Sequence, residues 1–333
     1  MTTPRVAGHE SAPVATIAAT TPVRRRRPTS GSLRSRARRV GRAWQLYVLL
    51  APTLAYFAIF KFWPMYGVQI AFRNYNPSAG FAGSEWVGWA HFDRFFSSFQ
   101  FGTLVENTIL LSLANLLITF PLPIILALLV NQLLSKRFKA FTQTVLYAPA
   151  FISTVIVVGL IYVLFSPRSG MVNHFISMVG GEPIFFMAEP SWFRPLYVGS
   201  SVWQDAGFSM VIYLAALASI DPSLHEAAKI DGASALQRIR HIDLPGIMPV
   251  VSILFILAVG NLLNVGFEKA LLLQTPLNIS ASQIIQTYVY QAGLQQAQFS
   301  YSAAIGLFNS VINLALLLTF NWIARRAKQN SLI

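Results

Sequence analysis

Amide, hydroxyl and carboxylate side chains lie inside apolar stretches of this sequence, and they are the residues best placed to do chemistry. A bilayer disfavours ionisable groups, so those that occur within it usually face the interior of a helix bundle or a watery cavity. Such groups can hydrogen-bond a hydroxyl-rich solute, while aromatic rings contact its apolar faces. The candidates to line such a path are Asn115, Asp205, Ser209, Tyr213, Asn261, Asn264, Glu268, Asn309 and Asn313.

Their spacing places several of them on shared helix faces. Asn261, Asn264 and Glu268 stand at i, i+3 and i+7 of one apolar stretch, which puts them on one face if that stretch is helical. Asn309 and Asn313 form a similar pair in the last stretch. The alternative is that the hydroxyl and amide side chains only hydrogen-bond between packed helices. Asp205 and Glu268, the two acidic members of the set, favour a cavity rather than hydrogen bonding between packed helices.

The same side chains offer little for catalysis. The chain has no cysteine, which excludes disulfides, thiolate metal sites and cysteine nucleophiles. The five histidines are scattered, and two of them, His225 and His241, lie in a polar loop where we expect them to be solvated. No Ser/His or metal constellation and no G-x-x-x-x-G-K-[ST] phosphate-binding loop occurs in the sequence. We therefore expect neither an enzyme nor a bound cofactor or metal.

The elements that hold the polar residues must be membrane-spanning helices. Only 11% of the residues are charged, 54% are hydrophobic and the mean hydropathy is +0.53, values typical of a polytopic membrane protein. About 20 apolar residues span the hydrocarbon core. Six segments meet that length, at 44–63, 107–133, 141–165, 193–219, 247–267 and 302–324. We expect an all-α fold, with the second span broken or kinked where Pro121 and Pro123 remove two backbone donors.

The distribution of charge predicts the orientation. Residues 1–40 are rich in Ala, Thr, Pro, Ser and Arg, and should form a disordered basic tail before the membrane domain of residues 41–333. Most of the 25 basic residues lie in this tail, in two loops on the same side and after the last span. The positive side is cytoplasmic, so we expect both termini there and the chain in the cell membrane. The net charge of +13 therefore indicates topology rather than a nucleic-acid partner.

The loop over residues 221–246 is polar but carries strong helix signals. Asp221 can accept hydrogen bonds from the first free N–H groups, and a proline follows it at the first helical position. Gly232 can adopt the left-handed conformation that ends a helix. Ser234, with a glutamine three residues later, has the pattern of a capping box, and we expect Pro245 to close this second helix. The polar loop should therefore form two short helices that join at a glycine.

In the polar loop, three residues separate Glu226-Ala227-Ala228 from Gly232, nine more separate Gly232 from Ile242, and one separates Ile242 from Leu244-Pro245. This residue order resembles the EAA signature of permease subunits of ABC importers. The resemblance implies the type I importer permease fold, with six transmembrane helices and a coupling loop that contacts a cytoplasmic ATPase. The coupling residues that it implies are Glu226, Ala227, Ala228, Gly232, Arg238, Asp243, Leu244 and Pro245.

Further segments are similar to one subgroup of that family, the permeases of complex-oligosaccharide and polysaccharide importers. They include PMYGVQIAFRNYNP from Pro64, YAPAFIS from Tyr147 and QFSYSAAIG from Gln298. The resemblance implies import of a sugar by alternating access, with a second permease, two ATPase subunits that bind ATP and magnesium, and an extracytoplasmic binding lipoprotein. The chain departs from the subgroup before its last span, where Gln283, Gln286 and Gln291 replace residues that are commonly charged.

Two other interpretations remain open at this level. The polar loop could be an amphipathic hairpin on the membrane surface, with Lys229, Arg238 and Arg240 facing lipid phosphates. The chain could also be an ion-coupled secondary transporter or a channel, a class that uses interrupted helices and intramembrane acids. Only the prolines of the second span favour that class.

Overall fold

The computed structural model describes residues 44–326, so the tail predicted for residues 1–40 lies outside the described part of the chain. The chain divides into two compact units, residues 1–65 and 66–333. The described part of the first unit consists of α2 (Trp44–Phe57), the π turn η1 (Ala58–Phe62) and α3 (Trp63–Met65). These elements begin an apolar helical segment, Trp44–Phe72, that is long enough to cross a membrane.

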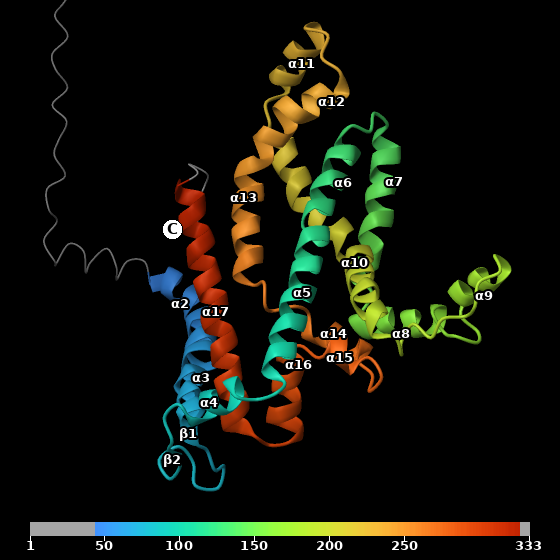
Figure 1. The fold of residues 1–333 in the computed structure, drawn as a ribbon. Coiled ribbons are helices and arrows are strands. Elements are labelled where there is room, and N and C mark those ends of the chain that lie inside the picture. Colours follow the sequence, from blue (N-terminus) through green and yellow to red (C-terminus); the bar gives the residue numbers. More distant parts are fainter. Residues whose placement is uncertain (1–43, 327–333) are drawn as a thin grey trace, which may run out of the picture. The chain divides into compact units, whose positions relative to one another are not determined.

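The second unit is almost entirely helical (Figure 1). Its one sheet within the described residues is an antiparallel ribbon of β1 (Arg73–Asn74) and β2 (Glu85–Trp86). Its helical elements are η2 (Tyr66–Phe72), α4 (Ala90–Phe96), α5 (Phe101–Thr119), α6 (Pro121–Asn131), α7 (Lys136–Tyr147), η3 (Ala148–Phe151), α8 (Thr154–Leu164), α9 (Met171–Met178), α10 (Pro190–Ala218), α11 (Pro222–Ile230), α12 (Ala235–Arg238), η4 (Ile239–Asp243), α13 (Leu244–Gly260), α14 (Phe267–Leu273), α15 (Ile279–Ser282), α16 (Ile285–Tyr290), η5 (Gln291–Gln295) and α17 (Phe299–Arg326).

Four described helices are long and apolar enough to span a membrane, and two bent helix pairs bring the number of possible spans to six. The second span is interrupted at Phe120, between α5 and α6, directly before the first of its two prolines. It nevertheless remains one helical span over Phe101–Asn131, because a proline in the first turn of a helix lacks only an N–H that would be unpaired anyway.

The third span is not the single helix expected for residues 141–165. The helix over Lys136–Phe151 meets α8 at a bend of 95°. Ser153 caps the new helix by accepting a hydrogen bond from the Ile156 N–H at 3.4 Å. Gln204 of α10 donates from Nε2 to the Ile152 carbonyl at 2.8 Å, which satisfies a backbone group that the bend leaves free. The bend thus depends on a contact from a distant helix.

The fifth span also differs from the expected segment 247–267. Its helix is continuous from α12 through the π turn η4 into α13 and ends at Gly260. The prediction that Pro245 closes a helix is wrong, because Pro245 lies in the first turn of α13 instead. In the π turn the Leu244 N–H donates to the Ile239 carbonyl, a wider spacing than in an α-helix.

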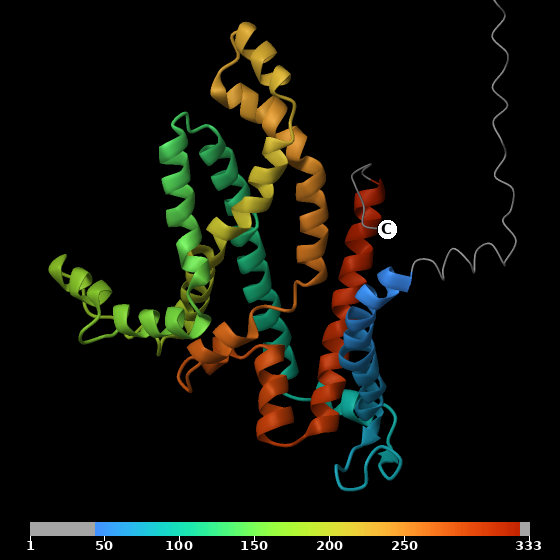
Figure 2. The ribbon, with the colours of Figure 1, turned by 180° about the vertical axis from the view of Figure 1, so that it is seen from behind.

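Helix α10 is the centre of the second unit, and it packs against α5, α6, α7 and α13. It approaches α7 most closely at Gly207, where a Cβ atom would lie 1.9 Å from the Leu146 carbonyl oxygen. Glycine is required there because any side chain would push the two helices apart. Two opposite views place α11 and α12 at one end of the unit, with the β1–β2 ribbon and the turn between α16 and α17 at the other (Figure 1, Figure 2).

Candidate functional site

Two adjoining cavities lie between α5, α10, the end of α13 and the start of α14. The first has a volume of about 320 Å³ and the second about 390 Å³. Asn115, Thr119, Ser209 and Gly266 line both of them. The cavities therefore share a wall, and the first is lined mostly by apolar side chains whereas the second is lined mostly by polar ones.

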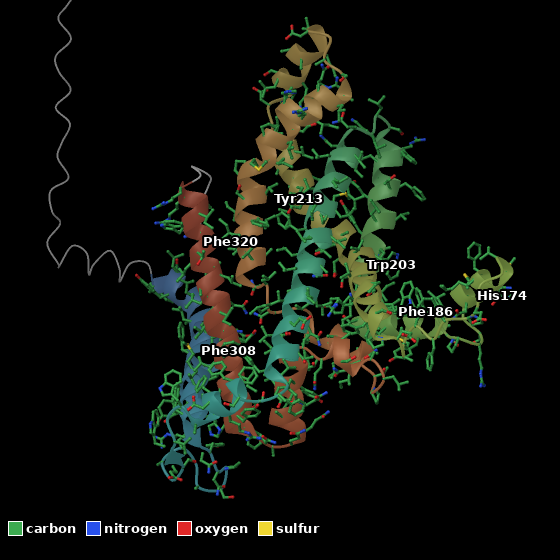
Figure 3. All side chains as sticks on the ribbon, viewed as in Figure 1. His174, Phe186, Trp203, Tyr213, Phe308 and Phe320 are labelled. Carbon is green, nitrogen blue, oxygen red and sulfur yellow. The ribbon has the colours of Figure 1, made fainter. Side chains whose placement is uncertain are left out.

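Most of the predicted path residues line these cavities. Asn115 and Ser209 border both, and the side chain of Tyr213, labelled in Figure 3, borders the first. The remaining lining residues from the predicted set are Asn261 and Asn264 in the first cavity and Asp205 and Glu268 in the second. Asn309 and Asn313 line neither.

The predicted helix face of Asn261, Asn264 and Glu268 does not exist. Helix α13 ends at Gly260, Asn261 and Asn264 lie in the following turn, and Glu268 belongs to α14. Asn313 of α17 holds this turn, since its Oδ1 accepts the Leu263 N–H at 3.1 Å. The three residues therefore reach the cavities from a break in the span, where turned backbone is tolerated because it lines a cavity.

Asn264 is oriented by two neighbouring amides. Its Oδ1 accepts one hydrogen bond from Gln286 Nε2 at 2.9 Å and another from Asn309 Nδ2 at 3.1 Å. A carbonyl oxygen has two lone pairs, so both are used by these donors. The amide group of Asn264 is thus fixed, and its own N–H donors remain for the first cavity.

The second cavity carries charge of both signs, and sequence reasoning found only the acids. Asp205 and Glu268 are exposed to it, and Lys269 lines it while only 6% of that residue is exposed. The Lys269 Nζ donates to Ser201 Oγ at 3.0 Å and lies 5.9 Å from the ring centroid of Tyr197. Lys269 could have been predicted as a path residue, because it directly follows Glu268 at the end of an apolar stretch. Its contact with Ser201 of α10 could not, because no local sequence pattern indicates that the two residues meet.

The caps of the polar loop form as predicted, but its second helix is the start of the long helix that ends at Gly260 rather than a short helix. Asp221 accepts the Ser223 N–H at 2.9 Å, and this hydrogen bond holds the pKa of the Asp221 carboxyl below its usual value. Gly232 has a φ of +76°. The Gly232 N–H donates to the Lys229 carbonyl and the Ala233 N–H to the Ala228 carbonyl, the pair of bonds that defines a Schellman motif.

The capping box of the second helix is complete. The Ser234 N–H donates to Gln237 Oε1 at 2.6 Å, and the Gln237 N–H donates to Ser234 Oγ at 3.3 Å. Arg238 donates from Nη1 to the Ala233 carbonyl at 2.8 Å, which fastens the end of α12 back onto the turn. The start of this long helix is therefore joined to the turn that follows α11 by bonds within the loop.

The outer surface of the polar loop combines an acid with apolar side chains. Glu226 and Ala227 are exposed, as is Gly232, whereas Ala228 is only partly exposed. Ile230 is 86% exposed and Leu236 is 73% exposed. Exposed large aliphatic side chains beside a charge are typical of a protein interface, and this face lies at the end of the second unit in Figure 1.

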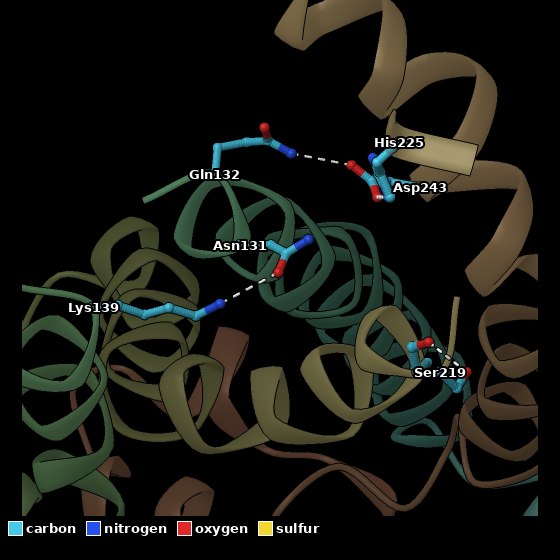
Figure 4. A network of polar contacts seen from close by, with 7 residues as sticks. Asn131, Gln132, Lys139, Ser219, His225 and Asp243 are labelled. Atoms are coloured by element: carbon cyan, nitrogen blue, oxygen red, sulfur yellow. Dashed lines mark hydrogen bonds and ion pairs between the residues drawn. The ribbon is translucent and has the colours of Figure 1, made fainter. Parts of the chain in front are cut away.

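Asp243 lies on the inside of the loop and is fully buried. Its Oδ1 is 3.2 Å from His225 Nε2, and its Oδ2 accepts from Gln132 Nε2 at 3.1 Å (Figure 4). The expectation that His225 is a solvated loop histidine is wrong, because the fold brings Asp243 of η4 against α11. These contacts join α11, η4 and the end of α6 through one carboxylate.

The remaining predicted coupling residues support the loop from the membrane side. Leu244 packs against the apolar cluster around Met210, Tyr213 and Ile247, and Pro245 is exposed. Within the described residues no group of three or more His, Asp or Glu side chains is placed to hold a metal ion.

The second unit thus combines two adjoining cavities between its helices with a structured polar loop at one end. The family model of the binding-protein-dependent transport system inner membrane component matches residues 119–329. The chain belongs to this family, and the predicted all-α membrane permease fold is confirmed. It is a multi-pass membrane protein.

Individual relatives are similar over most of their length. The polygalacturonan/rhamnogalacturonan transport system permease protein YteP of Bacillus subtilis (strain 168) is 47% identical, with 84% of this chain and 88% of that protein aligned. Protein LplB of the same organism is 44% identical over 86% of this chain and 90% of its own. A chain in the crystal structure of the bacterial alginate ABC transporter in complex with alginate pentasaccharide-bound periplasmic protein has a TM-score of 0.82 and 41% identity, covering 89% of this chain and 99% of that one.

Proposed function

We propose that this chain is one half of the membrane passage of an ATP-driven importer, and that it moves an oligosaccharide by alternating access. The observation that carries the proposal is the pair of cavities lined by Asn115, Ser209, Asn264 and Glu268. Amide and carboxylate groups suit sugar hydroxyls, and Tyr213 offers a ring for an apolar sugar face. A permease and a transporter that are named for polysaccharides are similar to the chain over more than four fifths of its length.

In this proposal, other subunits supply the free energy that drives transport. The sequence contains no phosphate-binding loop, so two cytoplasmic ATPases would bind ATP and magnesium. A second permease, different from this chain, would complete the passage, and an extracytoplasmic binding lipoprotein would deliver the sugar. Both termini, including the basic tail of residues 1–40, would lie in the cytoplasm.

The polar loop would be the contact for an ATPase. Its exposed face presents Glu226, Ala227 and Gly232 together with Ile230 and Leu236. Arg238 would stabilise the loop through its hydrogen bond to the Ala233 carbonyl. Asp243 would stabilise it through its contacts with His225 and Gln132. Closure of the ATPases would then move α11 and, through these contacts, the ends of α6 and α13.

The proposal is tested by transport in proteoliposomes that contain both permeases and both ATPases. Because the second cavity holds charges of both signs, the probes are size-graded oligomers of polygalacturonan, alginate and neutral galactan. We expect uptake of at least one series that requires ATP and the binding protein. Uptake without the ATPase subunits, or uptake driven by an ion gradient, would overturn the proposal.

A further inference from the structure

The second cavity holds all the charge that lines the two cavities. Its charged lining residues are Asp205, Glu268 and Lys269, whereas the residues that line the first cavity carry no charge. With both carboxylates ionised, the two acids outnumber the one ammonium. With one carboxyl protonated the charges would balance, so in neither state does the cavity have a surplus of positive charge.

The acids of the second cavity are accessible, whereas its ammonium is not. Asp205 and Glu268 are exposed, but only 6% of Lys269 is exposed. The Lys269 Nζ is already bound within the protein, to Ser201 Oγ at 3.0 Å. No described residue donates a hydrogen bond to either carboxylate. The surface that the second cavity offers to a solute is therefore that of a hydrogen-bond acceptor with negative charge.

One of the two acids is paired with the lysine by its position. Asp205 follows Ser201 by one helical turn on α10, so it lies on the helix face that holds Lys269. The charge of Asp205 balances that ammonium. Glu268, at the start of α14, is then the acid in excess. An unbalanced carboxylate in a membrane domain is costly, which favours a role in the passage over a role in packing.

This arrangement suits one class of sugar and disfavours another. A carboxylate accepts hydrogen bonds and donates none, so two neighbouring hydroxyls of a sugar ring can donate to its two oxygens. The rings of Tyr197 and Phe267 line the same cavity and can pack against the C–H faces of that sugar. A uronate ring instead presents a carboxylate of its own. It has the same sign of charge as the cavity surface, and repulsion between like charges is stronger where water is excluded.

We infer that the second cavity selects uncharged sugar rings over uronates, and that Glu268 is the residue that determines this specificity. This inference rests on the proposed function and names the class of sugar that the passage accepts. Discrimination arises from the unfavourable contact with the wrong sugar as well as from the hydrogen bonds to the right one.

Glu268 can be changed without a change in the shape of the cavity. The variant Glu268→Gln removes the charge and keeps the length of the side chain. The variant Glu268→Asp keeps the charge on a shorter side chain, so it separates charge from shape. The matched control is Glu106→Gln, which neutralises an exposed carboxylate of α5 that lines neither cavity.

The measurement is uptake by proteoliposomes that contain the complete importer. The probes are polygalacturonan oligomers of one length, as the free acid and as the methyl ester, since esterification removes the charge and keeps the sugar. Galactan oligomers of the same length are a second uncharged probe. The binding protein is the same in every sample, so a difference between variants arises in the permease.

We expect the unsubstituted importer to take up the uncharged probes faster than the free acid. In Glu268→Gln the ratio of acid uptake to uncharged-probe uptake should rise about tenfold, because one repulsive charge is lost. Glu268→Asp and Glu106→Gln should both keep the ratio of the unsubstituted protein.

The results that would overturn the inference are distinct from failure of the proposed function. Faster uptake of the free acid than of the uncharged probes by the unsubstituted importer would refute the selectivity and leave the proposed function intact. An unchanged ratio in Glu268→Gln, or an equal rise in Glu106→Gln, would show that Glu268 does not determine it. Absence of uptake of every probe, alginate oligomers included, would end the proposed function and the selectivity together.

Discussion

Asp243 is the residue on which the inner side of the polar loop depends. It is fully buried, and it contacts His225 on α11 and Gln132 at the end of α6. Its replacement by alanine would leave two partly buried polar groups without their acceptor, which costs about 2 kcal/mol. We expect Asp243→Ala to lower the Tm of the purified complex by roughly 5 °C and to reduce ATPase stimulation by the binding protein.

The control for this prediction is Glu182→Ala, which removes an exposed carboxylate far along the chain from the loop. That variant should keep both the Tm and the stimulated ATPase rate. If Asp243→Ala behaved as Glu182→Ala does, the carboxylate would not tie the loop to α6.

Gly232 has a backbone conformation that other residues adopt at a cost. Its φ is +76°, and a Cβ atom there would meet no atom within 4 Å, so the penalty comes from the backbone alone. Alanine should cost about 1 kcal/mol in this left-handed region, and a β-branched residue more. We expect Gly232→Val to reduce sugar uptake and ATPase stimulation, with the amount of protein in the membrane unchanged.

A valine at Gly102 of α5 makes the matched comparison, because Gly102 has open space but no positive φ. Uptake by Gly102→Val should remain close to that of the unsubstituted protein. Full activity of Gly232→Val would show that the Schellman turn is not needed for coupling.

Residue-level prediction succeeded where a signal is local. The caps at Asp221 and Ser234 and the helix end at Gly232 each depend on residues within five positions of one another, so the sequence pattern contains the whole interaction. The contact of His225 with Asp243 joins residues from two helices, and no spacing rule predicts it. Lys269 was missed as a path residue for the same reason, since its partner Ser201 lies on α10.

At the scale of elements, α12 is the first turn of the helix that continues through η4 and α13 to Gly260. The free N–H groups of this turn depend on the cap, and the Ser234 hydroxyl satisfies one of them. Ser234→Ala should cost about 1 kcal/mol, whereas Ser234→Asp should preserve the cap. Hydrogen exchange of the α12 amides should become about fivefold faster in the alanine variant. Equal exchange in both variants would contradict this role of the cap.

The spans show the limit of element-level prediction. Apolar length predicted the regions of the four helices that are long enough to span a membrane and of the two bent helix pairs, because a bilayer requires about 20 such residues whatever the neighbours are. The bend at Ile152 and the end of the fifth span at Gly260 were not predicted, since Gln204 and Asn313 satisfy the freed backbone groups from other helices. The polar residues after Gly260 were recognised for their chemistry, although the helical face proposed for them was wrong.

At the scale of the whole molecule, the proposed coupling requires the polar loop and the β1–β2 ribbon to face opposite sides of the membrane. The two segments lie at opposite ends of the second unit (Figure 1, Figure 2). The chain has no cysteine, so a single introduced thiol reports its own accessibility. Suitable positions are Ile230 of α11 and Ser78 in the ribbon loop, which are both exposed.

We expect a membrane-impermeant maleimide to label Ser78→Cys on intact cells, and to label Ile230→Cys only after the cells are made permeable. The physical reason is that basic loops remain on the cytoplasmic side during insertion. Lys229 and Arg240 lie in the same polar loop as the thiol at position 230. Addition of the ATPase subunits to permeable cells should then slow labelling of Ile230→Cys and leave Ser78→Cys unaffected, because only the former lies in the proposed contact. Labelling of Ile230→Cys from outside would place the loop beyond the reach of any cytoplasmic ATPase and would refute the coupling mechanism.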